Sequence, residues 1–181
     1  MKTSLLVMAA LLVATSASAA ELKQYGSAKI VYSNLNLEVD DQDSDMKTAY
    51  GLGLGYGVKI SDFRVEGELT LRAKNKLKED ESEGLTNHSL MVNGFYDIAT
   101  GTEFVPYVGV GFGLNRAKIA NAGTHSKFAY GASAGVAYNV NEKTAVDLGY
   151  TYTKIADIDD DEAGEFKQDT GEIKLGARYT F

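Results

Sequence analysis

Apolar and polar positions alternate along most of this chain, and residues 63–73 (FRVEGELTLRA) give the clearest example. One set of alternate positions there is apolar or small, and the other set carries the charged side chains and a threonine. Successive side chains of a β-strand point to opposite faces of a sheet, so a period of two predicts a strand. The pattern therefore predicts a strand with one apolar face and one charged face.

Eight segments of this kind follow one another along the chain. They cover residues 24–33, 48–59, 63–73, 86–97, 104–115, 128–140, 144–153 and 170–181. Each has about the length that a tilted membrane-spanning strand needs, which is about 9–11 residues. The connections between them alternate between long and short, beginning with a long one. This alternation is typical of outer-membrane barrels, whose long loops face outward and whose short turns face the periplasm.

The apolar faces of the eight segments indicate which side of the sheet meets lipid. None of these faces carries a charged side chain, and a Lys or Arg facing lipid at mid-bilayer costs about 2–4 kcal/mol. The alternative is a soluble eight-stranded barrel, such as a lipocalin, with its apolar faces inside. We interpret the sequence as an all-β fold, an eight-stranded antiparallel up-and-down transmembrane β-barrel.

Aromatic residues fall near the ends of the predicted strands, as in the interface girdles of membrane barrels. The set expected near the outer rim is Tyr32, Tyr50, Phe128, Tyr130, Tyr150 and Tyr152. The set expected near the inner rim is Tyr56, Phe63, Tyr96, Tyr138, Tyr179 and Phe181. The two sets independently favour the membrane interpretation.

The N-terminus has the features of a secretory signal peptide. Lys2 gives a positive start, residues 5–13 are apolar, and residues 17–19 (ASA) fit a cleavage site. A buried N-terminal helix is the alternative. We predict that residues 1–20 are a cleaved signal peptide, with cleavage after Ala19 or Ala20, and that residues 21–181 form the barrel domain. Cysteine is absent, which excludes disulfides and a lipid anchor on cysteine.

Several charged side chains belong to the faces that would point into the barrel. They are five bases and four acids: Lys29, Arg64, Glu66, Glu68, Arg72, Asp147, Glu172, Lys174 and Arg178. Unpaired charges in a narrow interior are unfavourable, so we expect ion pairs. If the last strand closes on the first, Glu172, Lys174 and Arg178 can meet Lys29 on one side and Asp147 on the other. Alternate glycines at 51, 53, 55 and 57 would form a smooth inner wall.

Two interpretations of these interior charges are open. One is a gated or selective channel, and the other is a polar plug that fills the barrel. Eight strands enclose an interior only just wide enough for side chains, so we favour the plug.

A search for catalytic residues finds two His-Ser pairs. His88 and Ser89 are adjacent in a strand, so they point to opposite faces and cannot form a nucleophile pair. His125 and Ser126 fall in a loop without an obvious orienting acid. We therefore predict no catalytic residues and no enzymatic activity.

A search for metal and cofactor sites finds only acidic loops. The loop that begins at Asp157 starts like a calcium-binding EF-hand, but its sixth position is Glu162 and its twelfth is Gln168. Asp41, Asp43 and Asp45 fail in the same way. We predict no metal site and no cofactor, and keep weak divalent-cation binding by these loops as a hypothesis. The net charge of −7 argues against nucleic acid as a partner.

The mature chain resembles the small eight-stranded outer-membrane barrels of Gram-negative bacteria: the OmpA-type barrel, the OmpX/Ail group and the opacity-protein-like porins. Residues 106–113 (PYVGVGFG) resemble a fifth-strand motif of the opacity-like group, and Tyr179 and Phe181 resemble the signal read by the barrel-assembly machinery. The resemblance implies an outer-membrane location among lipid and lipopolysaccharide, and biogenesis with periplasmic chaperones. Because the chain stops at the eighth strand, we expect no added periplasmic domain.

The function that follows from this resemblance is an expectation, because such barrels serve many roles. We expect a monomer with a structural and surface-interaction role: membrane integrity, adhesion or host contact through exposed loops. The first alternative is a narrow porin for small solutes. The second is an enzyme that modifies lipid A.

Overall fold

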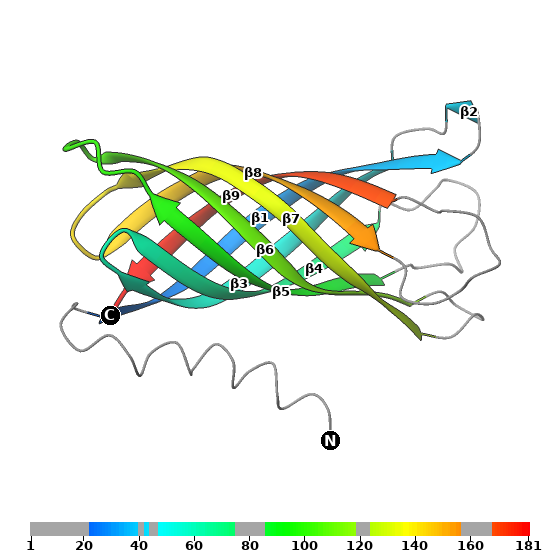
Figure 1. Ribbon diagram of the computed structural model, residues 1–181, viewed down its shortest axis with the longest axis horizontal. Helices are drawn as coiled ribbons and strands as arrows, with labels where there is room; N and C mark the ends of the chain where they lie inside the picture. The colour runs from blue at the N-terminus through cyan, green and yellow to red at the C-terminus, as the bar shows by residue number, and fades with distance from the viewer. Residues whose placement is uncertain (1–21, 40–41, 44–46, 75–85, 119–123, 157–167) are drawn as a thin grey trace, which may run out of the picture.

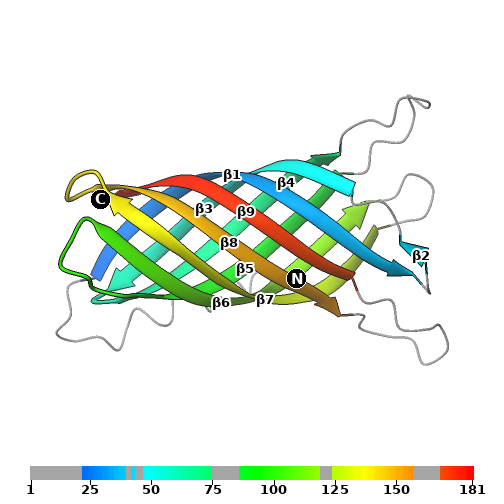
Figure 2. The same cartoon turned by 90° about the horizontal axis from the view of Figure 1, so that it is seen from above.

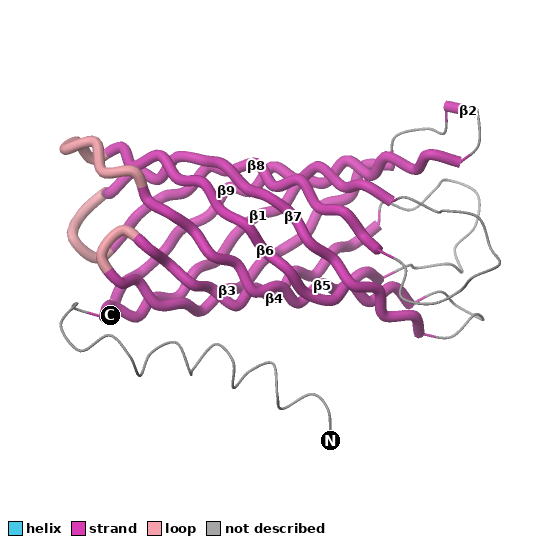
Figure 3. The backbone as a smooth tube through the Cα atoms, in the orientation of Figure 1, coloured by secondary structure: helices cyan, strands magenta, loops and turns pink. Residues whose placement is uncertain are grey.

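A computed structural model describes residues 22–39, 42–43, 47–74, 86–118, 124–156 and 168–181 of the chain. All regular structure in these residues is β-strand (Figure 3). No helix in this part of the chain is long and apolar enough to cross a membrane. The predicted signal peptide, the acidic positions 40–41 and 157–167, and the loop tips at 75–85 and 119–123 lie outside the described residues.

Eight long strands form a closed antiparallel barrel, as the sequence predicted (Figures 1 and 2). In chain order they are β1 (Leu22–Val39), β3 (Lys47–Ile60), β4 (Phe63–Lys74), β5 (Thr86–Asp97), β6 (Phe104–Lys118), β7 (Thr124–Asn139), β8 (Thr144–Ala156) and β9 (Gln168–Thr180). Each pairs with the next, and β9 pairs with β1 to close the barrel. The two-residue strand β2 (Gln42–Asp43) pairs only with the end of β1.

The strands run further than predicted at one end of the barrel. β1 continues to Val39, where the alternation predicted an end at residue 33, and β7 begins at Thr124 instead of 128. The alternating pattern fades where lipid contact ends, but paired strands continue to satisfy each other's backbone groups. The barrel wall therefore extends beyond the apolar band at this end.

The two ends of the barrel differ in their connections. One end carries the short links 61–62, 98–103 and 140–143, together with Phe181 (Figure 1). Ser61 has a φ of 54°, which the tight link between β3 and β4 requires. The other end, where β1, β4, β6 and β8 finish, borders the longer connections. Long connections face outward in outer-membrane barrels, so we call it the cell-surface end and the other the periplasmic end.

The strand register determines how wide the barrel is. A path through directly paired residues returns to β1 at Leu35, ten residues beyond its start at Tyr25. The path passes through Gly57, Glu66, Asn93, Gly111, Gly131, Thr153 and Thr170. Eight strands with this shear tilt by about 40° and enclose a backbone radius of roughly 8 Å. Long side chains can therefore reach across the interior.

The distribution of side chains is inverted relative to a soluble protein. Val110 and Phe181 on the outer face are each 69% exposed, whereas Glu66, Glu68 and Glu172 on the inner face are each 1% exposed. Large apolar side chains cover the outside of every barrel strand. This arrangement confirms the facing that the alternation predicted, with apolar side chains toward lipid.

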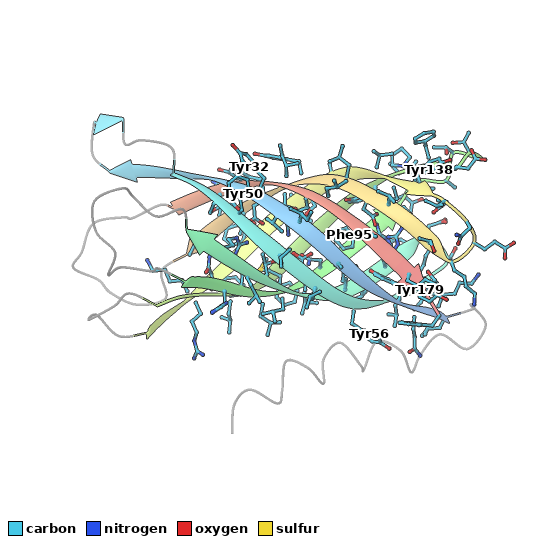
Figure 4. The ribbon with its side chains drawn as sticks, turned by 180° about the vertical axis from the view of Figure 1, so that it is seen from behind. Tyr32, Tyr50, Tyr56, Phe95, Tyr138 and Tyr179 are labelled. Carbon is cyan, nitrogen blue, oxygen red and sulfur yellow. The ribbon has the colours of Figure 1, made fainter. Side chains whose placement is uncertain are left out.

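Aromatic rings cluster in contacting pairs at both ends of the outer face. At the cell-surface end, Tyr32 and Tyr50 lie with ring centroids 5.4 Å apart (Figure 4). At the periplasmic end, the rings of Phe63 and Tyr96 are 5.0 Å apart, and the pairs Phe104–Tyr138 and Tyr179–Phe181 contact in the same way. Two aromatic girdles therefore bound the apolar band.

Candidate functional site

The nine charged residues predicted for the interior all point into the barrel, from β1, β4, β8 and β9. Six of them are buried, and Lys29, Arg72 and Lys174 keep only 10–14% of their side-chain surface exposed. Their contacts fall into layers along the barrel axis: a centre, a cell-surface layer and a periplasmic layer.

The central layer is built around Glu68 of β4. Its carboxylate accepts a hydrogen bond from Lys174 of β9 at 2.6 Å and contacts the Lys29 ammonium of β1. Lys29 also lies 2.5 Å from Glu66, which accepts a hydrogen bond from the Ser27 hydroxyl at 3.1 Å. Two lysines and two glutamates thus neutralise each other in the middle of the membrane-spanning wall. Such complete pairing is what buried charges require.

The cell-surface layer is built around Glu172 of β9. Its Oε1 accepts from Arg72 Nε at 2.7 Å and from Ser33 Oγ at 2.8 Å. Arg72 also donates through Nη1 to Ser89 Oγ at 2.9 Å. Lys174 Nζ lies 3.5 Å from Glu172 and joins this layer to the central one.

The periplasmic layer contains groups that the sequence analysis missed. Arg64 donates to Asp97 at 2.8 Å, and Lys59 donates to the same carboxylate at 2.7 Å. The Arg64 guanidinium lies 4.7 Å from the ring centroid of Phe95 and 5.0 Å from that of Tyr107. Figure 4 labels Phe95 within the barrel. Cation–π contacts and ion pairs together fill this end of the interior.

Asp97 and Lys59 were missed because they stand at strand ends, next to short links. A signal was present in the sequence, because Asp97 continues the alternation of Asn93 and Phe95, and Lys59 continues that of Gly57. Following the inward face to the last paired residue of each strand would have found both.

Arg178 and Asp147 form a looser pair in the same part of the barrel. Arg178 Nη1 lies 3.7 Å from Asp147 Oδ1, which is longer than a hydrogen bond. The Arg178 guanidinium also lies 5.5 Å from the ring centroid of Tyr25. β8 and β9 thus contribute one more pair of opposite charges.

The structure pairs Lys29 differently from our expectation that it would meet charges on the last strand. In the β1–β9 register, Gly176 stands opposite Lys29, and Glu172 stands opposite Ser33. The acids that Lys29 contacts, Glu66 and Glu68, lie on β4, on the far side of β3. Alternation along a strand points to partners on neighbouring strands, whereas the narrow barrel lets long side chains reach across its interior.

The inner glycines are covered by these side chains and do not line an open lumen. A Cβ built on Gly55 would lie 2.8 Å from the Glu66 carboxyl carbon, and one on Gly176 would lie 2.6 Å from Lys29 Cγ. A Cβ on Gly57 would meet the Tyr25 ring at 2.6 Å. The smooth inner wall we expected is therefore the surface on which interior side chains lie.

The spaces between the described interior side chains include two small cavities, each of about 20 Å³. A water molecule needs about 10–15 Å³ on this measure, so each has room for one or two waters. Asn93, Thr151 and Lys174 border both cavities. Both cavities thus lie among polar side chains that can hydrogen-bond such waters.

His88 and Ser89 do not assemble a catalytic group. Ser89 is buried inside the barrel, and His88 is on the outer face opposite Arg116 of β6. The side chains of His125 and Ser126 lie outside the description. No group of three or more His, Cys, Asp or Glu side chains that could hold a metal ion occurs in the described part of the chain. Of the acids proposed for weak cation binding, Asp43 lies in β2, whereas Asp41, Asp45 and the loop at 157–167 lie outside the described residues.

An outer face made of an apolar band between two aromatic girdles, around an ion-paired polar core, defines an integral outer-membrane β-barrel protein. The chain belongs to the family of the outer membrane protein beta-barrel domain, whose model matches residues 4–181. Its location in the outer membrane follows from this membership and from the fold.

Known proteins of this kind resemble the chain. Outer membrane protein PagN of Salmonella typhimurium is 29% identical over 115 residues, which cover 50% of this chain and 48% of PagN. The match thus spans about half the length of that relative.

Among solved structures, Neisserial surface protein A has a TM-score of 0.72 at 22% identity and covers 87% of this chain and 97% of its own. The attachment invasion locus protein Ail of Yersinia pestis has a TM-score of 0.50 at 20% identity, covering 88% and 99%. At these identities the resemblance establishes the fold.

Proposed function

We propose that the protein is a structural and surface-interaction protein of the outer membrane. The closed barrel anchors the chain and presents its longer connections at the cell surface, where they contribute to membrane integrity, adhesion or host contact. Residues 1–20 direct export and are removed.

The observation that carries this proposal is the filled interior. Lys29, Glu66, Glu68 and Lys174 occupy the centre of the barrel, and Arg72 and Glu172 occupy the layer above. A narrow porin would need a continuous path past these pairs. The core therefore supports a scaffold rather than a transport pathway, and it serves to hold the barrel shut.

Enzymatic action on lipid has less support still. A nucleophile and its base must come within hydrogen-bond reach of each other, whereas His88 and Ser89 point to opposite sides of the barrel wall. We propose that the protein is not an enzyme and needs no cofactor.

The last strand supports a role in assembly. Phe181 N–H donates to the Gln24 carbonyl at 2.9 Å, and the rings of Tyr179 and Phe181 lie 5.7 Å apart on the outer face. The hydrogen bond extends the pairing of β9 with β1 to the last residue. We propose that Tyr179 and Phe181 are read by the barrel-assembly machinery, after delivery of the chain by periplasmic chaperones.

Attachment is a reasonable form for the surface role to take. Ail, which has the same fold, is named for attachment and invasion, and it has also been solved with the heparin analogue sucrose octasulfate. For the present chain, contact with a host or matrix surface is a proposal that rests on the family and on the barrel's design.

The proposal is tested by cell adhesion with variants that lose one connection at a time. Bacteria would display the wild type, or a barrel in which one of the connections after β1, β4, β6 or β8 is replaced by a short Gly-Ser link. We expect at least one replacement to abolish binding to cultured cells or immobilised matrix. The matched control replaces residues 98–103 at the periplasmic end and should bind normally. Binding at the wild-type level by all four variants would refute the proposed surface role.

A further inference from the structure

Three aromatic side chains are buried inside the described part of the barrel, and all three lie near its periplasmic end. They are Tyr25 of β1, Phe95 of β5 and Tyr107 of β6, each no more than 9% exposed. β1 and β6 begin at this end and β5 finishes there (Figure 1). They differ from the rings of the two girdles, which face lipid. Aromatic packing is therefore a feature of one end of the polar interior.

Each of these rings lies against the glycine that stands opposite it on the neighbouring strand. The register sets Tyr25 opposite Gly57 of β3, and Phe95 opposite Gly109 of β6. A Cβ on Gly57 would lie 2.6 Å from Tyr25 Cζ, and a Cβ on Gly109 would lie 3.0 Å from Phe95 Cε1. Glycine in a strand often marks a place where another group approaches closely. Here the rings occupy the space that side chains would otherwise fill.

Tyr107 reaches across two glycines instead of one. Gly135 of β7 stands opposite Tyr107, and Gly149 of β8 stands opposite Gly135. A Cβ on Gly135 would lie 2.5 Å from Tyr107 Cζ, and a Cβ on Gly149 would meet the Tyr107 hydroxyl. The side chain thus extends from β6 over β7 to β8, and the absence of side chains at both positions leaves room for it.

Two buried arginines contact the three rings. The Arg64 guanidinium faces both Phe95 and Tyr107, whose ring centroids lie 5.6 Å apart with an interplanar angle of 86°. The Arg178 guanidinium stands over the ring of Tyr25. The Tyr25 hydroxyl has no hydrogen-bond partner among the described residues. Packing on glycine and cation–π contacts therefore position this ring.

One of the two small interior cavities ends at these rings. Phe95 and Tyr107 border it on β5 and β6, and Ser133 borders it on β7. Nearer the periplasm, the inward positions of β7 and β8 carry Ala137 and Ala145, which are 0% and 5% exposed. Neither alanine borders the cavity. An apolar constriction of this kind excludes water and ions.

We propose that Tyr25, Phe95 and Tyr107 form an aromatic floor that closes the interior to the periplasm, separately from the ion pairs at the centre of the barrel. The interior then has two closures in series, one made of charges and one made of rings. The floor is independent of the surface role, because it lies at the opposite end of the barrel from the longer connections.

The test measures how fast a thiol above the floor reacts with a reagent that enters from the periplasmic end. The chain has no native cysteine, so Ser133→Cys places a single thiol beside the cavity. The protein is folded into lipid vesicles and treated with a membrane-impermeant methanethiosulfonate reagent. Asn139→Cys, at an exposed position near the periplasmic end of the same strand, gives the reference rate and shows which end faces the reagent.

With Tyr107 in place, the thiol at position 133 should react much more slowly than the thiol at position 139. Tyr107→Ala should speed the reaction at position 133 by about tenfold or more, because the reagent no longer waits for a local opening of the core. Tyr107→Phe keeps the ring and should leave the rate unchanged. Phe95→Ala, which removes a second ring of the floor, should speed the reaction in the same way.

Shifted gel mobility on heating verifies that each variant is folded, and Phe95→Ala serves alone if Tyr107→Ala does not fold. Equal rates at positions 133 and 139 in the presence of all three rings would overturn the proposal. An unchanged slow rate at position 133 after a ring is removed would overturn it as well, because the rings would then not be the barrier.

Discussion

Arg72 of β4 and Glu172 of β9 meet inside the barrel, with Arg72 Nη2 2.5 Å from Glu172 Oε1, although they lie 100 residues apart in sequence. The strands β1 and β3 separate them in the wall. The ion pair thus spans the seam where β9 closes on β1. It connects β9 to β4, a strand with which β9 shares no backbone hydrogen bonds.

Removing the acid of this pair should weaken the whole barrel. Glu172→Gln leaves the buried Arg72 guanidinium without its counter-charge, and breaking a buried pair from one side costs about 3–5 kcal/mol. We expect the urea midpoint of the protein folded into lipid vesicles to fall accordingly. Glu142→Gln, which changes an exposed acid in a turn, should leave the midpoint unchanged. Equal midpoints for the two variants would contradict a stabilising role for Glu172.

The two central glutamates should differ in their contribution. Glu68 contacts two lysines, Lys29 and Lys174, and accepts from the Thr70 hydroxyl at 3.0 Å. Glu66 contacts Lys29 alone among the cations of the described interior. Glu68→Gln removes the carboxylate charge that two ammonium groups share, so it should destabilise the barrel more than Glu66→Gln in the same unfolding experiment. The reverse order would show that Glu68 is not the centre of the network.

The lipid-facing side of β4 offers a test of the orientation of the strand. Leu69 is 41% exposed on the outer face, so Leu69→Arg should lower the free energy of unfolding by about 2–4 kcal/mol or block membrane assembly. Leu69→Phe keeps the side chain apolar and should assemble normally. Similar yields of heat-modifiable, folded protein from the two variants would contradict the assigned facing.

Glycines inside and outside the barrel should respond differently to a methyl group. A Cβ on Gly57 would lie 2.6 Å from both the Tyr25 ring and the Val65 carbonyl, whereas a Cβ on Gly94 would have no neighbour within 4 Å. Gly57→Ala should therefore destabilise by about 1–3 kcal/mol through overpacking. Gly94→Ala should have little effect on the unfolding midpoint. If Gly57→Ala has the same unfolding midpoint as Gly94→Ala, the space beside Gly57 can accommodate a methyl group and the close contacts of the inner wall are not limiting.

Much of the fold could be predicted because lipid imposes a strict rule on alternate residues. Lys29 and Ile30 must point to opposite sides of the wall, and this decides the facing of β1 without any knowledge of its neighbours. The partner of Lys29 could not be predicted in the same way. It depends on the shear and radius of the closed barrel, which bring β4 within reach of β1, and no local pattern encodes them.

The inward charged residues at the strand ends were also not predicted. Asp97 and Lys59 belong to the inward face, but they adjoin short links where the alternation is brief. Phe95 and Tyr107 also point inward, although aromatic residues in a membrane barrel are expected at its outer girdles. Their positions make sense only with Arg64, whose guanidinium lies close to both rings.

The central claim is that the interior is closed by its ion pairs, and planar-bilayer conductance tests it most directly. The wild-type protein, incorporated into a bilayer beside an open porin as positive control, should give no steady single-channel openings. Steady openings of uniform size from the wild type would contradict the account, because ions would then have a continuous path past Lys29, Glu68 and Lys174.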